Sequence, residues 1–434
     1  MRISALNLYP VAVADGPLRS SYGRHAPYAL RTIVELRTTD GITGLSETYG
    51  GDAPLAALES LRPRILGSDP FQLTRLWMDL AAEAGEQGDR SQTFLVPGEN
   101  PLDQHTRTFA AIEVACLDII GKACGRPLCD VVGGRARDRV PYSAYLFYKH
   151  GGGGGLDADQ REDEYGECLD PVSMVRQARQ MIGRYGFREI KLKGGVLDPG
   201  LETETIRRLR EEFGPECPLR IDPNCAWSVE TSVGIGLKLH RELSGGGYLE
   251  DPTATIEGMA EVRRQLLEQG IETPLASNVA VTCFEHLPVA RRLDAVQVVL
   301  SDPHYWGGVR NMQHLSRLSE ALGLGLSMHS NNHLGISLMI MTHAAAACPR
   351  LTYACDTHYP WQSDRDEVVA GGRVAIVDGA VRIPDRPGLG VDLDFDQIAR
   401  GVERYRKLPY RKRDDEAEMR RHVDPGWKRI LPRW

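Results

Sequence analysis

The sequence predicts an α/β protein in which a barrel of alternating strands and helices follows a smaller α+β region. Short apolar or β-branched runs begin near residue 142 and, after the first gap, recur every 22–30 residues. The intervals between them have the spacing of amphipathic helices, most clearly over 172–185 and 202–213. Eight strands alternating with helices indicate a parallel sheet, and eight is the number that closes a (β/α)8 barrel. The alternative is an open doubly wound sheet, but no G-x-G-x-x-G motif follows any of these runs.

The eight predicted strands have in common an apolar run bounded by turn or polar residues. They lie at 142–148, 189–192, 219–221, 247–249, 273–276, 295–300, 322–328 and 351–354.

The N-terminal third has a different pattern. Residues 32–39 and 42–47 are two strand-like runs, and Asp40-Gly41 between them is typical of a hairpin with a type I′ turn. From residue 106 to 125, apolar residues recur at helical spacing. Five consecutive glycines at 151–155 are too flexible for the interior of an element and predict a loop or lid.

Length and composition exclude several classes of protein. The 434 residues suffice for two or three domains with full cores, and 42% hydrophobic with 26% charged residues excludes disordered and fibrous chains. Nine singly scattered cysteines argue against disulfides and a zinc site and favour reduced thiols in the cytoplasm. The first residues do not resemble a signal peptide, and no run of roughly 18 apolar residues predicts a membrane span.

The charge is unevenly distributed. The net charge of -7 disfavours a dedicated nucleic-acid binder, yet residues 400–434 contain twelve Lys or Arg against six Asp or Glu. Such a run is commonly a solvated arm, and the alternative is that it places arginines near an anionic ligand. Nucleic-acid binding through this tail is a third reading, but aromatic residues are only 7% of the chain and no recognised module is present.

Residues capable of acid–base or metal chemistry follow six consecutive predicted strands. Because the active sites of such barrels lie at the C-terminal ends of the strands, these side chains are expected to converge on one face. One polar residue after a strand is ordinary, whereas six strands in succession favour an active site. The residues are Lys191, Lys193, Asp222, Asn224, Glu250, Asp251, Asn278, Asp302, His304 and the segment from His329 to His333.

Three of these residues predict a metal site. Asp222, Glu250 and Asn278 offer oxygen ligands from three adjacent strands. Hard oxygen donors without His or Cys suit Mg²⁺ or Mn²⁺, with positions left for water and substrate oxygens. Each carboxylate alone would more often be a helix cap or an ion-pair partner, but as a set at matching strand ends they favour the metal.

Two further groups are candidate bases. Lys191 and Lys193 alternate at period two, so both point to the same face, where a second ammonium and a divalent cation would lower their pKa. The alternative is an edge strand with solvated lysines. His329 and Asp302 end neighbouring strands, and a carboxylate on one imidazole nitrogen would fix the tautomer and raise the basicity of the other. His304 and His333 lie near the site by sequence and fit a supporting role equally well.

The chain resembles the enolase superfamily and, within it, the glucarate dehydratase group. The resemblance covers nearly the whole sequence, and an ordered set of motifs carries it. The motifs are IKLKGGV at 190–196, IDPNCAW at 221–227, LEDP at 249–252, SDPHYW at 301–306, HSNNHL at 329–334, DTHY at 356–359, PGLGVD at 387–392 and RDD at 413–415.

This resemblance implies a domain organisation and a site. It implies an α+β capping domain over 1–135, completed by 385–434, and a modified (β/α) barrel over 136–384. It implies Mg²⁺ on Asp222, Glu250 and Asn278, Lys193 assisted by Lys191 as one base, and the His329–Asp302 pair as the other. Substrate contacts implied by the resemblance are His25, Tyr145 or Tyr148, Asn224, Asn331, His358 and Arg413, the last clamping a distal carboxylate bidentately.

The expected activity is that of a hydro-lyase acting on an acid sugar. A base removes the proton α to a carboxylate, the β-hydroxyl leaves as water, and the resulting enol becomes a keto-deoxy acid; a cation on the carboxylate stabilises the developing charge. The expected substrate is a hexaric diacid, D-glucarate or its epimer L-idarate, and we expect a homo-oligomer. The alternatives are an epimerase or racemase, a dehydratase of a different diacid sugar, and a non-catalytic sugar-acid binder.

The sequence also departs from the pattern of the group at three places. His105 stands where a threonine is usual, Gly307-Gly308 stands where larger residues are expected, and the glycine-rich segment from Lys149 to Gly166 differs from the usual lid. None of these touches the predicted metal or bases. All three are expected to line the distal end of the substrate and so bear on its identity.

Overall fold

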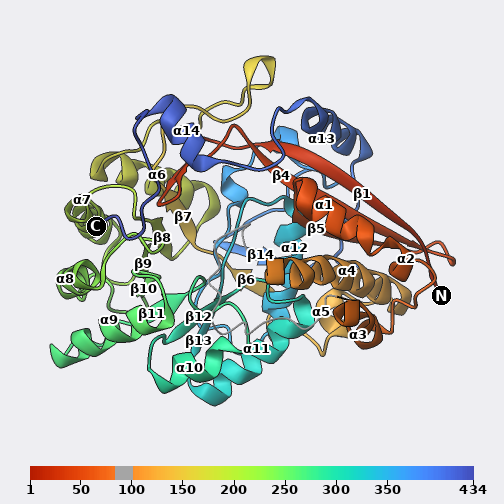
Figure 1. Cartoon of the computed structure of the whole chain (residues 1–434), viewed down its shortest axis with the longest axis horizontal. Helices are drawn as coiled ribbons and strands as arrows, with labels where there is room; N and C mark the ends of the chain where they lie inside the picture. The colour runs from red at the N-terminus through yellow and green to blue at the C-terminus, as the bar shows by residue number, and fades with distance from the viewer. Residues whose placement is uncertain (84–100) are drawn as a thin grey trace.

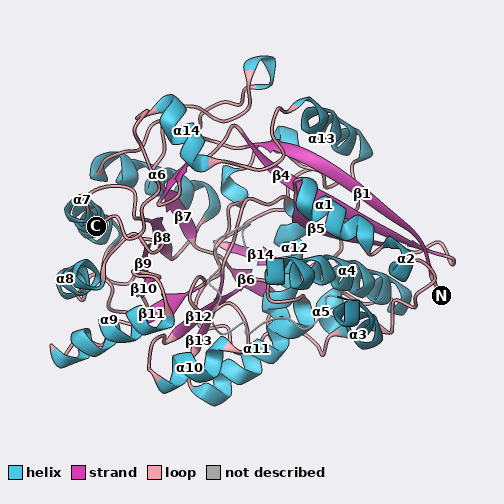
Figure 2. Cartoon of the chain, in the orientation of Figure 1, coloured by secondary structure: helices cyan, strands magenta, loops and turns pink. Residues whose placement is uncertain are grey.

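Two sheets organise the chain, an antiparallel one in the N-terminal region and a parallel one in the barrel (Figures 1 and 2). The structure, a computed structural model, describes residues 1–83 and 101–434. The antiparallel sheet has the strand order β1-β4-β5, and the parallel sheet has the order β13-β12-β11-β10-β9-β8-β7.

The N-terminal region is built on a long hairpin. Its strands are β1 (Ile3–Ala14), β4 (Tyr28–Thr38) and β5 (Thr43–Tyr49), and its helices are α1 (Asp52–Ser60), α2 (Arg62–Ile65), α3 (Leu73–Glu83), α4 (Pro101–Cys124) and α5 (Leu128–Val131). Helix α4 packs against β5 and covers one face of this sheet. The short strands β2 (Arg19–Ser20) and β3 (Gly23–Arg24) pair in the segment that leads from β1 to β4.

The hairpin of β4 and β5 was predicted correctly, but its turn was not. A type I′ turn needs positive φ at both central residues. Gly41 has a φ of 81°, whereas Asp40 is outside the left-handed region. The loop instead closes with Thr38 and Ile42, where the Thr38 amide donates to the Ile42 carbonyl at 2.9 Å.

The barrel alternates strands and helices as predicted, and all adjacent strands in its sheet are parallel. Its strands are β7 (Ala144–Phe147), β8 (Ile190–Lys193), β9 (Leu219–Asp222), β10 (Tyr248–Glu250), β11 (Leu275–Ser277), β12 (Val298–Ser301) and β13 (Gly325–Met328). Its helices are α6 (Pro171–Tyr185), α7 (Pro199–Phe213), α8 (Val229–Leu239), α9 (Ile256–Glu268), α10 (His286–Arg292), α11 (Val309–Leu322) and α12 (Gly335–Ala347).

Local sequence signals explain why these helices begin and end where they do. Asp170 precedes α6 and accepts hydrogen bonds from the amides of Val172 and Ser173, which satisfies donors that lack partners within the helix. The same helix stops at Gly186, whose φ of 71° suits glycine. Ser228 likewise caps α8 by accepting from the Thr231 amide.

The eighth predicted strand is irregular. Residues 351–354 form no regular strand, but the neighbouring segment lies between β13 and β7 and contacts both. The Asp356 amide donates to the Met328 carbonyl at 2.8 Å, and the Ser143 amide donates to the Cys355 carbonyl at 2.9 Å. A short bridge between Tyr142 and Cys355 completes the closure. The barrel therefore has seven regular strands and an irregular eighth position.

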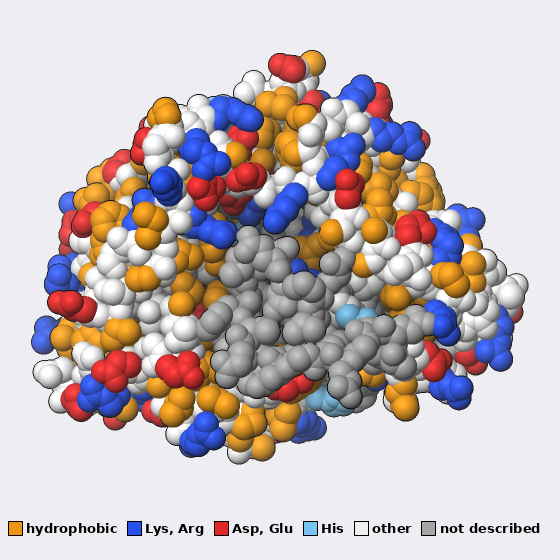
Figure 3. All heavy atoms as spheres, viewed as in Figure 1, with side chains coloured by type: hydrophobic (Ala, Val, Ile, Leu, Met, Phe, Trp, Pro, Cys, Tyr) orange, Lys and Arg blue, Asp and Glu red, His pale blue; other side chains and the backbone are white. Residues whose placement is uncertain are grey.

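The C-terminal residues are folded onto the N-terminal region. Helix α13 (Phe395–Lys407) packs against β1, and α14 (Asp415–His422) lies beside β3 (Figure 1). Many of their basic side chains have acidic partners, as in Arg420–Glu416, Arg421–Glu418 and Lys407–Glu403. Figure 3 shows Lys and Arg interspersed with Asp and Glu over this end of the molecule. Other pairs reach outside the tail: Arg404 lies 2.7 Å from Asp366, and Glu418 lies 3.4 Å from Arg24. The tail is therefore not a solvated arm, because several of its charges pair with the rest of the chain.

One further pair of short strands lies in the barrel region. Strands β6 (Arg139–Pro141) and β14 (Ala380–Arg382) pair antiparallel beside the barrel. Within the described parts of the chain, no helix has both the length and the apolar character that crossing a bilayer requires.

Candidate functional site

The two lysines of β8 point into the barrel. Lys191 pairs with Arg220 and Lys193 with Asp222 in the register between β8 and β9, so these four side chains share the inner face. Lys191 is fully buried and lies 2.6 Å from carboxylate oxygens of Glu250 and Asp356. Lys193 is nearer the strand end and donates to Asp222 Oδ2 at 2.6 Å. Both lysines point inward as expected, and the alternative of an edge strand with solvated lysines is wrong.

The protein charges around Lys191 act against the lowering of its pKa that was predicted beside a second ammonium and a divalent cation. Burial by itself would lower the pKa, but the carboxylates of Asp356 and Glu250 outweigh burial and raise it well above the ordinary lysine value. The lowering predicted from the sequence did not include Asp356, which belongs to the irregular eighth position and reaches the inner face only through the closure of the barrel.

Asp222 and Glu250 form a buried pair of carboxylates at the ends of β9 and β10. Burial, followed by the charge of Asp222, raises the pKa of Glu250 well above its usual range. Burial also acts to raise the pKa of Asp222, but Lys193 and Lys191 hold it below the ordinary value. Two such carboxylates repel each other in a dry interior, and a divalent cation between them would relieve that repulsion.

Asn278 faces the same carboxylates from the end of β11. Its amide group lies 3.1 Å from Glu250 Oε1 and 2.9 Å from Asp251 Oδ2. With its nitrogen on this side the amide donates to both carboxylates, and its oxygen accepts from His329 Nε2 at 3.3 Å when that nitrogen carries a proton. The side chain can therefore present oxygen to a cation or nitrogen to the carboxylates.

These donors fit a hard divalent cation. Two carboxylates and one amide oxygen, all buried, are the ligand types that Mg²⁺ and Mn²⁺ prefer. Among the described residues, no three His, Cys, Asp or Glu side chains gather as a set that would hold a metal. The predicted set contains only two carboxylates, and its third ligand is the amide of Asn278.

His329 and Asp302 lie together at the ends of β13 and β12. His329 Nδ1 is 3.0 Å from Asp302 Oδ2, and both side chains are buried. The other oxygen of Asp302 is taken by His304, whose Nδ1 is 2.6 Å from Oδ1. Burial acts against ionisation of Asp302, yet His304 and His329 lower its pKa far below the usual range. Asp302 is therefore a carboxylate held by two imidazoles.

The strand order places these groups on two sides of the carboxylates. Lys191 and Lys193 come from β8, the predicted metal ligands follow β9, β10 and β11, and Asp302 and His329 end β12 and β13. The sheet therefore separates the lysines from the histidine by three strands of oxygen donors. Two basic groups that flank the predicted cation-binding centre are what proton abstraction from either face of a substrate requires.

The aromatic side of the site comes from β7. Tyr145 lies on the inner face, with its ring 4.8 Å from Lys191 Nζ and 5.0 Å from the His358 ring. Phe147 is on the same face and contacts the rings of His25 and His358. Tyr148 points the other way, because strand side chains alternate, and its hydroxyl donates to Thr205 on α7. Of the two predicted tyrosines, only Tyr145 is in this group.

A second cluster gathers around the buried carboxylate of Asp15. His25 Nδ1 is 3.0 Å from Asp15 Oδ2, and Asn332 Nδ2 donates to Asp15 Oδ1 at 2.9 Å. Arg413 donates from Nη1 to Asn332 Oδ1 at 3.0 Å, and its Nε forms an ion pair with Asp415 Oδ1 at 2.8 Å. Residues of the N-terminal region, the barrel and the C-terminal tail thus meet here. Arg413 is already engaged by two partners, which differs from the bidentate clamp expected from the sequence.

Three predicted contacts are placed by neighbouring loops. Asn331 donates to the Tyr49 hydroxyl at 2.9 Å and so contacts the N-terminal sheet. His358 Nδ1 lies 3.1 Å from Ser330 Oγ, and burial, reinforced by the charge of His25, holds the pKa of His358 well below the ordinary value. Asn224 follows Asp222 with a φ of 52° and accepts on its backbone oxygen from Ser21 Oγ.

Two of the unusual positions are explained by packing. A Cβ at Gly308 would overlap Oε2 of Glu113, which accepts from the Val309 amide at the start of α11. Gly307 and Gly308 also have φ values of 92° and 100°, which favour glycine. His105 packs against the Trp77 ring in the N-terminal region. Gly308 makes room for Glu113, and a Cβ at Gly307 would meet Asn311 and Thr106. That the two glycines also line the substrate stays a prediction.

The glycine-rich segment is an ordered loop. Lys149 Nζ and the amides of Gly152 and Gly166 all donate to the carboxylate of Asp163. Gly154 packs against the backbone of Asp15, where a Cβ would collide with it. This loop therefore supports the backbone that carries Asp15.

Several residues of the site were not predicted from the sequence. Asp15, Phe147, Asn332 and Asp356 are contributed by segments far apart in the chain. Asn332 and Asp356 belong to motifs that carry the family resemblance. Asn332 follows the predicted Asn331, and Asp356 lies two positions before the predicted His358, so this closeness in the sequence was the available signal. Nothing local to Asp15 marks it as a partner of His25.

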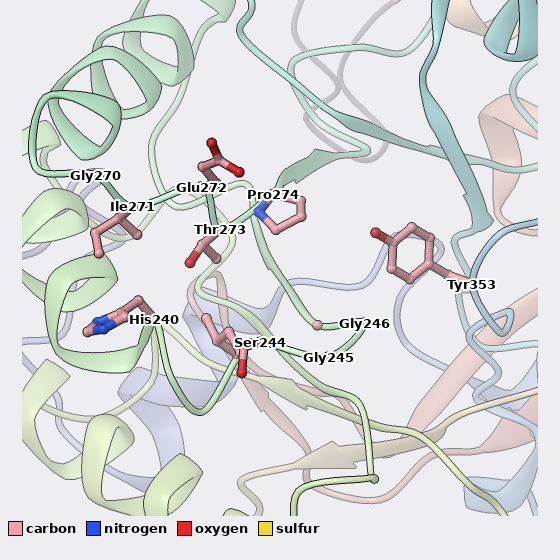
Figure 4. Close-up of a pocket in the computed structure, with 12 residues that line it drawn as sticks. His240, Ser244, Gly245, Gly246, Gly270, Ile271, Glu272, Thr273, Pro274 and Tyr353 are labelled. Carbon is pink, nitrogen blue, oxygen red and sulfur yellow. The ribbon is translucent and has the colours of Figure 1, made fainter.

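A hollow of about 330 Å³ lies at the opposite end of the barrel (Figure 4). Its walls include segments 244–247 and 270–274, which precede β10 and β11, together with His240 and Tyr353. None of the predicted catalytic or metal-binding residues lines it. The hollow is therefore separate from the site, which is at the C-terminal ends of the strands.

The fold and the site define a class of protein, a capped (β/α) barrel in which buried oxygen donors lie between two basic groups. Residues 7–133 match the mandelate racemase / muconate lactonizing enzyme N-terminal domain, and residues 173–398 match the family described as enolase C-terminal domain-like. The chain belongs to the enolase superfamily.

Individual relatives are similar over the whole chain. A probable glucarate dehydratase of Streptomyces coelicolor is 43% identical over 100% of this chain and 99% of its own length. The crystal structure of an enolase from Pseudomonas fluorescens, with bound magnesium, potassium and tartrate, has a TM-score of 0.91 and 42% identity, covering 100% of this chain and 99% of that one. An enolase from Thermobispora bispora, complexed with magnesium and formate, has a TM-score of 0.90 and 47% identity, with 100% of both chains covered.

Proposed function

We propose that the protein is a Mg²⁺-dependent dehydratase that converts a hexaric diacid, D-glucarate or L-idarate, into a keto-deoxy acid. The observation that carries the proposal is the placement of Lys193 and His329 on the two sides of the Asp222–Glu250 pair. The name of the Streptomyces relative and the magnesium bound to two similar structures support the substrate class and the metal.

The metal would be held by Asp222, Glu250 and Asn278. When bound, Mg²⁺ would supply positive charge to the substrate carboxylate as the neighbouring carbon loses its proton. The position of Asn278 supports this assignment, because its amide group lies 3.1 Å from Glu250 Oε1 and can offer its oxygen as the third ligand.

The side chains of this chain would carry out the proton transfers. His329 or Lys193 removes the proton from the carbon next to the carboxylate, according to the configuration of that carbon. The C–H electrons form the new double bond, the C–O bond to the β-hydroxyl breaks, and a protonated group of the site returns a proton so that water leaves. Asp302 fixes His329 Nδ1 as a donor, so a neutral His329 keeps the lone pair of Nε2 for this task.

The far end of a diacid would be recognised by the cluster at Asp15. Arg413, His25 and Asn332 converge on this carboxylate from three regions of the chain. A distal carboxylate of the substrate would meet the guanidinium of Arg413 and the imidazole of His25, and the positive charge of Arg413 would offset the charges of that carboxylate and of Asp15.

The test is a screen of hexaric and aldonic acids with Mg²⁺, with detection of the keto-deoxy acid. We expect turnover of a hexaric acid and losses of at least about 100-fold in kcat for Lys193→Ala and His329→Ala with the matching epimers. Lys238→Ala, which removes an exposed lysine of α8, is the matched control. Near-normal turnover in both single variants would contradict the assignment of the bases.

Epimerisation is the second candidate, because two opposed bases are also what inversion of a carbon requires. Its product retains the hydroxyl and exchanges only the α-proton, so mass spectrometry in deuterated water separates it from dehydration. The nine cysteines, all in the described part of the chain, are free thiols, and a cytoplasmic location stays an expectation. A homo-oligomer stays an expectation.

A further inference from the structure

A chain of buried hydrogen bonds leads from the His329–Asp302 pair away from the site. His304 lies next in this chain, with Nδ1 2.6 Å from Asp302 Oδ1 and Nε2 2.8 Å from Ser337 Oγ. The backbone amide of His304 also donates to Asp302 Oδ1, at 2.8 Å. Asp302 therefore has one oxygen committed to His304 and the other to His329.

The chemistry of the groups sets the direction of these hydrogen bonds. Asp302 is ionised, so both of its oxygens only accept, and each histidine must donate to it from Nδ1. A neutral His304 then has its lone pair on Nε2 and accepts the proton of the Ser337 hydroxyl. The Ser337 oxygen in turn accepts from Arg31 Nη2 at 3.2 Å, because a guanidinium can only donate.

The far end of the chain lies in the N-terminal region. Arg31 of β4 donates from Nε to Glu47 of β5 at 2.8 Å, and both side chains are buried. Glu47 also accepts from the amides of Leu334 and Ser337, at the start of α12. The loop from His329 to Leu334 is thus fixed by the N-terminal sheet at its end and by Asp302 at its beginning.

We propose that His304 is a positioning residue, which holds Asp302 so that its other oxygen fixes the tautomer and direction of His329. Through Ser337 it ties this pair to Arg31 and Glu47 of the N-terminal region. The inference rests on the proposed function for its catalytic consequence, but the tautomer of His329 is a property of the protein itself. Without the donor from the His304 side chain, Oδ1 of Asp302 keeps only the backbone amide of His304 as a partner, so the direction of the carboxylate is less firmly held.

The experiment uses two variants, each of which replaces one of the two ring nitrogens of His304 with an amide nitrogen. An asparagine amide places its nitrogen near the position of Nδ1, so His304→Asn keeps the donor to Asp302. A glutamine amide reaches the position of Nε2, so His304→Gln keeps a partner for Ser337 and loses the donor. His343→Gln, a buried histidine that contacts Cys129 and Leu389, is the control for loss of an imidazole.

The first measurement needs no substrate. Nitrogen NMR of protein labelled in its histidines reports which ring nitrogen carries the proton, and the signal of His329 is assigned from its loss in His329→Asn. We expect Nδ1–H in the wild type and in His304→Asn, and a mixture of tautomers in His304→Gln. Ser337→Ala, one link further away, should give a smaller change in the same direction. An unchanged His329 signal in both His304→Gln and Ser337→Ala would overturn the inference.

The second measurement uses the other base as an internal control. Exchange of the α-proton with deuterated solvent is followed for D-glucarate and L-idarate, and His329→Ala and Lys193→Ala show which base serves each epimer. His304→Gln should lower kcat for the His329-dependent epimer by about 10-fold or more, with KM nearly unchanged, and leave the Lys193-dependent epimer within about 3-fold. An equal fall for both epimers would mean a general structural role and contradict the proposal.

The two measurements keep the two proposals apart. A wild-type protein that exchanges neither diacid would count against the proposed function. The NMR result would still decide whether His304 positions His329.

Discussion

The ammonium of Lys191 lies 2.6 Å from Oδ2 of Asp356, a residue 165 positions further along the chain. Glu250 is the second partner of the same ammonium. Lys191 is thus held between a carboxylate of the predicted metal site and a carboxylate of the irregular segment that closes the barrel. Because the lysine shares its charge between them, Asp356 reduces the pull of Lys191 on Glu250.

This relationship predicts an effect of Asp356→Asn on metal binding. The substitution removes a negative charge near the site and leaves Glu250 as the main partner of Lys191, and both changes weaken binding of a cation. We expect the affinity for Mg²⁺, measured by calorimetric titration, to fall about 10-fold or more. Asp385→Asn, at an exposed position, is the control. Affinity equal to that of the wild type would contradict a role of Asp356.

Mg²⁺ itself should stabilise the fold. A ligand that binds the native state alone adds about 2.7 kcal/mol at one hundred times its Kd. We expect the Tm of the wild type to rise with Mg²⁺ and the Tm of Glu250→Gln to be independent of it, because that variant lacks a ligand charge. Glu268→Gln, on the exposed side of α9, should respond as the wild type does. A rise in Tm that survives Glu250→Gln would place the cation elsewhere.

Arg413→Met should separate diacids from monoacids. The side chain is engaged by Asn332 and Asp415 and would meet the distal carboxylate of a diacid. KM for a hexaric acid should rise by about 10-fold or more, since a charge-assisted hydrogen bond is lost, while KM for an aldonic acid changes little. Arg420→Met, an arginine of α14 paired with Glu416, is the control. Equal effects on both substrates would remove Arg413 from the distal site.

Gly308→Ala should destabilise the protein strongly. The new Cβ would overlap the carboxylate of Glu113, and the φ of 100° disfavours alanine. We expect a loss of at least about 2 kcal/mol in the free energy of unfolding, measured with urea. Gly183→Ala, in an exposed part of α6 with open space around it, should instead stabilise by about 0.5–1 kcal/mol. A neutral Gly308→Ala would show that Glu113 moves aside easily.

The buried His343 should account for part of the loss of folding stability at acid pH. Its Nδ1 accepts from the Cys129 amide and its Nε2 donates to Leu389, and burial lowers its pKa from 6.5 to about 4. The unfolded chain therefore binds the proton first, so the contribution to stability is complete above about pH 6.5 and is lost as the pH falls toward 4.

The matching variant is His343→Gln, which does not take up a proton. The difference in unfolding free energy between wild type and variant should shrink between pH 7.5 and 4.5, by up to about 3 kcal/mol. Urea unfolding at several pH values measures this directly. Parallel curves of unfolding free energy against pH for the two proteins would mean that burial does not lower the pKa of His343.

Much of the site was determined by local periodicity. Strand residues alternate between two faces, so Lys191 and Lys193 were expected to point inward together, and they do. The same alternation puts Tyr145 on the face of the lysines and Tyr148 on the opposite face. The sequence alone did not determine which of the two tyrosines shares the face of the lysines. The ends of β9, β10 and β11 were also marked locally, because a polar residue follows an apolar run at Asp222, Glu250 and Asn278.

The sequence by itself therefore determined the barrel, the order of its strands and the residues at their C-terminal ends. Only the tertiary structure decided which groups share a proton or a charge. Asp356 meets Lys191, Asp15 meets His25, and His304 shares Asp302 with His329, because loops and distant segments are brought together by packing. Strand periodicity acts between near neighbours in the chain, whereas the direction of a loop side chain and the pKa of a buried group depend on every element packed around it.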